Sequence, residues 1–211
     1  MKAMKLLVVA GFALSIFIWA NLSGAILVTS LPGGTVIPMP AVNYFGPGPQ
    51  TFGDITWTST HGGSVFGRTG AYGFGQNGEW NGTLGPMAGV NNSSDTMTFT
   101  FSTPVQGVGG FMNYDPYQSP LTTIAVYDED NEFIESFNLT FLTYMVTNSG
   151  SFYGFQEESA IIKSFTLSYS FIGITNLTTL TTTSAVPLPG AVVLLGSGLV
   201  GLIGFGRKRL G

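Results

Sequence analysis

Acidic side chains have the clearest capacity for chemistry in this 211-residue sequence, and they are densest at Asp128-Glu-Asp-Asn-Glu132. Calcium takes six to eight oxygen ligands from carboxylates and carbonyls, so Asp128, Asp130 and Glu132 are candidate calcium ligands. The segment lacks the central glycine and the terminal glutamate of an EF-hand loop. The sequence favours the alternative, a solvated hairpin turn, because Asp and Asn side chains readily accept hydrogen bonds from nearby backbone amides.

Paired carboxylates offer a second kind of chemistry, glycoside hydrolysis, in which two acids flank a sugar bond and one has a raised pKa. Sequence alone does not pair these acids in space. The candidates are Asp54, Glu79, Asp95, Asp115, Glu157 and Glu158. A glycosidase is therefore the third choice among the functions considered.

The single histidine, His61, stands in STHGGS between Ser59 and Ser64. A Ser-His-Asp hydrolase needs an acid that holds the histidine and an oxyanion hole, and no nucleophile motif surrounds these serines. One histidine and no cysteine provide too few donors for zinc. We predict an exposed loop histidine, no enzymatic activity, and no cofactor apart from the calcium option.

Aromatic side chains raise the question of binding. Tyr72 and Trp80 lie in a glycine-rich stretch, and Tyr114 and Tyr117 lie in NYDPYQ. Exposed rings of this kind stack on sugars and hydrogen-bond through their polar tips. Rings buried in a core are the more common outcome, so sugar binding by these four residues is the alternative interpretation.

The elements that must position these residues are strands. In DTMTFTFS, Met97, Phe99 and Phe101 alternate with threonine, which predicts a strand with one buried face. Similar short runs separated by Gly, Pro, Asn and Asp continue through residues 26–177. We predict an all-β domain there, a β-sandwich of jelly-roll type. The glycine-rich residues 65–89 should form loops with short edge strands, and 178–185 should form a threonine-rich spacer.

Charge excludes one class of partner. Between the two ends the chain has two cations, Arg68 and Lys163, and all 11 acids, which leaves a net charge of −9. Nucleic-acid binding depends on Lys and Arg that neutralise phosphates, so we expect no nucleic-acid partner.

Both ends of the chain have the composition of targeting segments. Residues 1–25 combine Lys2 and Lys5, an apolar run and small residues before Ile26, which is typical of a signal peptide. Cleavage after Ala25 is the first choice and cleavage after Ala20 the second, and an uncleaved N-terminal anchor is the alternative interpretation. Residues 190–206 are apolar throughout and end at Arg207, Lys208 and Arg209. A helix of this length would be roughly 25 Å long, enough for a short membrane span with its basic end in the cytoplasm.

The last 26 residues, 186–211, resemble a PEP-CTERM sorting domain. The resemblance rests on Val186-Pro187-Leu188-Pro189, the glycine-interrupted apolar helix and the closing basic cluster. Leu188 stands where the family usually has glutamate. The resemblance implies a bacterial exported or surface protein that inserts in the membrane through this helix and is cut near the prolines by an exosortase-like membrane protease. Several body stretches, among them FTFSTPVQGVGGFMNY, are also similar to the small β-sandwich domains that precede this signal.

Taken together, these patterns predict an exported, non-catalytic β-sandwich at the cell surface or in the extracellular matrix, acting in adhesion or matrix assembly. The alternative is a carbohydrate-binding module that recognises extracellular polysaccharide.

Overall fold

A computed structural model of the chain describes residues 25–82, 85–144, 147, 148 and 150–181. In these residues the chain is all-β, with 16 strands and one 3₁₀ turn, η1 (Gly75–Asn77). The expected signal helix and C-terminal membrane helix lie outside the described residues. Within the part that is described, no helix has the length and apolar character to cross a membrane.

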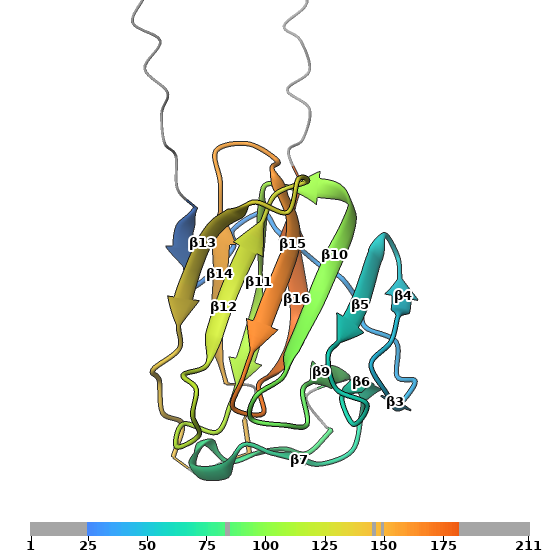
Figure 1. The fold of residues 1–211 in the computed structure, drawn as a ribbon, viewed down its shortest axis with the longest axis vertical. Helices are drawn as coiled ribbons and strands as arrows, with labels where there is room; N and C mark the ends of the chain where they lie inside the picture. The colour runs from blue at the N-terminus through green and yellow to red at the C-terminus, as the bar shows by residue number, and fades with distance from the viewer. Residues whose placement is uncertain (1–24, 83–84, 145–146, 149, 182–211) are drawn as a thin grey trace, which may run out of the picture.

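Two large antiparallel sheets form the layers of a sandwich-like arrangement (Figure 1). The eight-stranded sheet contains, in spatial order, β1 (Ile26–Val28), β14 (Ser151–Gln156), β11 (Gly107–Asn113), β16 (Gly173–Leu180), β9 (Met87–Gly89), β6 (Val65–Arg68) and β3 (Tyr44–Phe45), with β2 (Thr35–Val36) also paired to β16. The six-stranded sheet contains β13 (Phe133–Asn138), β12 (Thr123–Tyr127), β15 (Ile162–Ser168), β10 (Thr96–Val105), β5 (Ile55–Ser59) and β4 (Gln50–Phe52). A small hairpin pairs β7 (Tyr72–Gly73) with β8 (Glu79–Trp80).

The main core lies between the two large sheets. Met97, Phe99 and Phe101 of β10 are all buried, as their alternation with threonine predicted. From the opposite layer, Phe155 of β14 meets Phe165 of β15 edge to face, with ring centroids 6.4 Å apart. Such interdigitation of two inner faces is how packed sheets bury their apolar residues.

The described chain begins and ends at the same end of the sandwich, which we call the entry end (Figure 1). Gly107 at the start of β11 pairs with both Gln156 and Leu180, and Gln156 also pairs with Ile26. Strand β11 runs from there to the opposite end, the distal end, where residues 114–122 connect it to β12.

Two sequence expectations differ from the observed strands. Strand β16 continues to Leu180, so residues 178–180 belong to the sheet and not to a spacer. The reason is that Thr178 and Thr179 pair with β2 and β11 and are themselves buried. Within residues 65–89, β6 and β9 are short as expected, but they are inner strands of the eight-stranded sheet and not edges.

Candidate functional site

Two of the predicted sugar-binding rings, Tyr72 and Trp80, lie in a second small core. It consists of Val65, Tyr72, Phe74, Trp80 and Met87, on the outer side of β6, β9 and β16. The Tyr72 hydroxyl donates to the carbonyl of Val90, and the indole N–H of Trp80 donates to Gly85 O at 3.0 Å. Burial raises the pKa of Tyr72, as expected for a phenol removed from water. Neither ring presents a free face to a sugar.

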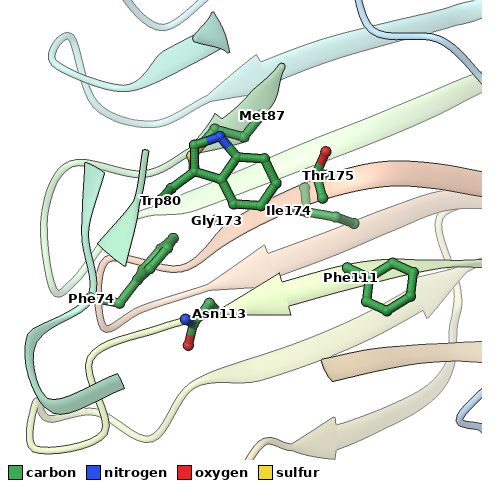
Figure 2. A pocket seen from close by; sticks show the side chains of 8 residues that line it. All are labelled: Phe74, Trp80, Met87, Phe111, Asn113, Gly173, Ile174 and Thr175. Carbon is green, nitrogen blue, oxygen red and sulfur yellow. The ribbon is translucent and has the colours of Figure 1, made fainter. Parts of the chain in front are cut away.

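The floor of this second core is a glycine. Figure 2 shows the rings of Phe74 and Trp80 over the start of β16, where Gly173 has no side chain. A Cβ atom at Gly173 would lie 2.3 Å from Met87 Cε and 3.0 Å from Phe74 Cζ. The Phe74 ring and the Met87 side chain therefore pack directly against the backbone of the sheet, and the glycine-rich insertion folds onto it.

The other two predicted rings, Tyr114 and Tyr117, come together at the distal end. Tyr114 is buried, and its hydroxyl donates to Phe141 O at 3.0 Å. Burial, and then the neighbouring Tyr153, raise the pKa of Tyr114 to about 12. Tyr117 differs, because 74% of its surface is exposed. Of the four rings, Tyr117 alone offers an open aromatic face to a partner.

The loop that presents Tyr117 is held by Asp115. One carboxylate oxygen, Oδ1, accepts from the backbone N–H of Tyr117 at 3.2 Å, and Oδ2 accepts from Gln118 Nε2 at 2.9 Å. The backbone N–H of Asp115 donates to Ser170 O at 2.8 Å, which fastens the loop to the turn before β16. Asp115 thus has a structural role here, and its two oxygens are occupied by the loop itself.

Tyr117 stands at the rim of a pocket of about 230 Å³. The rim is apolar, with Leu121 62% and Leu142 43% exposed. Thr122 lines the pocket and is buried, and its Oγ1 atom has no hydrogen-bond partner. The remaining lining residues are Tyr114, Pro116, Gln118, Leu139, Thr140 and Ser170. An exposed ring and an apolar rim beside the accessible polar side chains of Gln118 and Thr140 form an arrangement suited to a ligand with both apolar faces and hydroxyl groups.

Asn77 at the end of η1 holds Phe141 and Thr143, which flank Leu142 of the pocket lining. Asn77 is completely buried, and its side-chain Oδ1 accepts from the Thr143 N–H at 2.9 Å. Its backbone carbonyl accepts from Thr143 Oγ1 and from the side-chain amides of Asn113 and Asn148. A buried polar network that is satisfied in this way rigidifies the segment that it holds.

Sequence reasoning identified Tyr114 and Tyr117 but missed Thr122, Leu142 and Asn77. Leu142 is one more apolar residue in the run Leu139-Thr-Phe-Leu142, so the sequence gave no sign of its exposure. Asn77 acts on Thr143, 66 positions away, and no local pattern contains that contact. The one sequence feature that pointed to Asn77 was its place as a polar residue in the turn-forming sequence Gln76-Asn77-Gly78.

The candidate calcium ligands form the hairpin turn that the sequence favoured. Asp128 Oδ1 accepts from the N–H groups of Asp130 at 3.0 Å and Glu132 at 2.8 Å, and Asn131 has a positive φ of 62°. Among the described residues, no three His, Asp or Glu side chains are grouped to hold a metal ion. The Asp128 carboxylate is committed to the backbone of the turn.

Replacing Asp128 with alanine is therefore expected to lower the free energy of unfolding by about 1 kcal/mol, the usual contribution of a hydrogen bond. Asp130→Ala is the matched control, because the turn uses the backbone N–H of Asp130. Thermal unfolding with and without millimolar calcium measures both. A rise in the melting temperature on adding calcium, lost in both variants, would show that the turn is an ion site after all.

His61 does meet an acid, but in the wrong arrangement for a triad. Its Nδ1 lies 3.7 Å from Asp95 Oδ2, yet the same Nδ1 accepts a hydrogen bond from the Gly63 N–H at 3.0 Å. A triad histidine instead donates its Nδ1–H to the acid. The nearby Ser59 and Ser64 hydroxyls bond to each other at 2.7 Å. This cluster closes a loop and lacks the proton relay of a hydrolase.

The remaining candidate acids are spread over different elements. Asp54 lies in the turn between β4 and β5, Glu79 lies in β8, and Asp115 lies in the distal loop. Glu157 and Glu158 follow β14 at the entry end, far from the pocket under Tyr117.

Comparisons with known proteins found no matching protein family, no matching curated protein and no matching solved structure. Function therefore has to be inferred from the site itself.

Proposed function

We propose that this chain is an exported, non-catalytic binding protein of the cell surface or extracellular matrix. It acts in adhesion or matrix assembly, and the pocket beside Tyr117 makes contact with extracellular polysaccharide. One observation carries this proposal: the exposed ring of Tyr117 and an apolar rim stand beside a pocket whose accessible polar lining includes Gln118 and Thr140.

The position of the pocket supports the proposal. The described chain begins and ends at the entry end, and residues 114–122, which contribute most of the pocket lining, form the connection at the distal end (Figure 1). A chain tethered through its C-terminal segment would hold the pocket away from the tether. That placement would leave the pocket free to contact a polymer.

The strand order supports the finer description of the fold as a jelly roll. Strands β9, β16, β11 and β14 are neighbours in one sheet, and β10, β15, β12 and β13 are neighbours in the other. In chain order, β9, β11, β14 and β16 belong to the first sheet, and β10, β12, β13 and β15 belong to the second. This connectivity is the one expected of a jelly roll built from two Greek keys. Jelly rolls occur in lectins, but the fold alone does not assign a ligand.

Export and sorting depend on the two ends of the chain. Residues 1–25 would act as the signal peptide. The motif Val186-Pro187-Leu188-Pro189 and the cluster Arg207, Lys208 and Arg209 would direct membrane insertion and cutting by an exosortase-like protease.

Intact mass measured separately in the membrane and secreted fractions of the host tests this sorting step. We expect a secreted species that begins at Ile26 and ends near Pro187. Replacing Arg207, Lys208 and Arg209 with serine should move the chain into an uncut or mislocalised pool, since the basic cluster fixes the orientation of the helix. A single membrane-bound wild-type species that retains residues 207–211 would contradict sorting and leave a plain anchor.

A dedicated carbohydrate-binding module is the second candidate. The polar groups in the pocket favour it, because Gln118 and Thr140 can hydrogen-bond hydroxyls while Tyr117 covers an apolar sugar face. The two candidates differ in specificity. A module should prefer one defined oligosaccharide, whereas a matrix adhesin should bind the host polymer through many weak, repeated contacts.

A further inference from the structure

Glu157 is a buried carboxylate at the entry end, directly after β14. It is 4% exposed, and its Oε1 atom is buried without a hydrogen-bond partner. Its backbone is fixed by the bond from its N–H to Gln106 O at 2.8 Å. An ionised carboxylate in such a position is unfavourable unless a positive group accompanies it.

The charged groups that act on Glu157 are themselves acidic. Burial first, and then the charges of Glu158 and of Glu135 on β13, raise the pKa of Glu157. The two cations of the described chain are engaged elsewhere. Lys163 bonds Ser102 O and lies 4.0 Å from Glu129, and Arg68 bonds Ala71 O. The site therefore has a carboxylate and no cation from the described side chains.

The strand register brings the start of the described chain to this carboxylate. Ile26 on β1 is paired with Gln156, the last residue of β14, and the same antiparallel register continued by one residue places Ala25 opposite Glu157. Residues directly opposite on antiparallel strands have Cβ atoms about 5 Å apart. Ala25 is itself buried. Ile26, Gln156 and Glu157 also line one pocket of about 250 Å³.

We propose that removal of residues 1–25 creates the missing cation, and that the α-ammonium of Ile26 pairs with the carboxylate of Glu157. In the cleavage, water adds its hydroxyl to the carbonyl carbon of Ala25, and the nitrogen of Ile26 leaves as an amine that takes up a proton. Loss of Ala25 also empties the space beside Glu157. The inference rests on the export that we propose, and it makes the mature fold dependent on processing at this one bond.

The pairing predicts that Glu157→Gln changes the melting temperature in opposite directions in the blocked and the processed chain. In a chain whose N-terminus is blocked, the raised pKa of Glu157 means that the folded state binds its proton more tightly than the unfolded state. Stability is then lost as pH rises from the ordinary glutamate pKa through the raised one. Glu157→Gln should raise the melting temperature of the blocked chain at pH 7 and have little effect at pH 4. In the processed chain, the same substitution removes an ion pair and should lower the melting temperature by several degrees at pH 7.

The test uses the exported protein recovered from its host, with wild type and Glu157→Gln compared. N-terminal sequencing identifies the first residue, and limited acylation at pH 7 followed by peptide mapping gives the reactivity of the α-amine, with Lys163 as the internal reference. We expect Ile26 as the first residue, and acylation of its amine about tenfold slower in wild type than in Glu157→Gln, because a one-unit rise in amine pKa lowers the reactive neutral fraction tenfold. Wild type acylated at Ile26 should also melt at a lower temperature than the unmodified chain, a readout that survives if Glu157→Gln does not fold.

Equal acylation rates in the two chains, or a substitution effect of the same sign in blocked and free chains, would overturn the inference. A first residue other than Ile26 would overturn it as well. Polysaccharide binding by the same preparations separates this failure from failure of the proposed function, because Glu157 and the Tyr117 pocket lie at opposite ends.

Discussion

Replacing Trp80 with alanine should lower the free energy of unfolding by about 3–5 kcal/mol, the usual range for deleting a buried tryptophan side chain. Trp80 is 2% exposed and packs with Phe74 and Met87 above Gly173 (Figure 2). Its loss would leave a cavity and an unpartnered Gly85 carbonyl. Chemical denaturation of the exported protein measures the change, and the melting temperature should fall on the order of 10 °C.

Tyr117→Ala is the matched control for this prediction, because it removes an aromatic side chain that is 74% exposed. It should change the free energy of unfolding by less than about 1 kcal/mol. If Trp80→Ala keeps its stability and loses polysaccharide binding, Trp80 would be an exposed sugar-binding ring. That result would contradict its place in the second core.

Tyr117→Ala is also expected to weaken binding to the extracellular polysaccharide of the host about 30-fold or more. Aromatic residues at the centre of a binding site commonly contribute about 2 kcal/mol or more, and that free energy corresponds to this factor. Co-sedimentation of the protein with the purified polymer gives the affinity. Tyr117→Phe should retain most of it, because the ring face and not the hydroxyl makes the contact.

Phe133→Ala provides the binding control. Phe133 is 58% exposed, but it belongs to the β12–β13 hairpin, whose turn lies at the entry end. Its removal should leave the affinity unchanged. Equal losses in Tyr117→Ala and Phe133→Ala would mean that binding depends on general surface hydrophobicity and not on the distal pocket.

The alternating residues of β10 predicted both the all-β class and the buried face. Successive side chains of a strand point to opposite faces, so a strand with one face in solvent alternates apolar and polar residues. The Asp128 turn was equally predictable, since its hydrogen bonds join residues within four positions. These features depend on local sequence, and local sequence was enough to find them.

Tyr72, Trp80 and Tyr117 could not be told apart in the same way. All three lie among glycines, prolines and polar residues, where no periodicity indicates which ring is covered. Trp80 is buried because it packs with Phe74 and Met87, whose side chains lie against Gly173 of β16, almost 100 positions later. The burial of the unsatisfied Thr122 hydroxyl likewise depends on contact between segments 114–122 and 139–142, which local sequence patterns do not indicate.

The most direct measurement of the central claim is where the exported chain resides in a culture of its own host. Antibody detection in separated matrix and medium fractions would compare wild type, Phe133→Ala and Tyr117→Ala at equal expression. The distal-pocket account predicts that the first two remain in the matrix fraction and that Tyr117→Ala moves into the medium. Retention of Tyr117→Ala in the matrix at the wild-type level would contradict it.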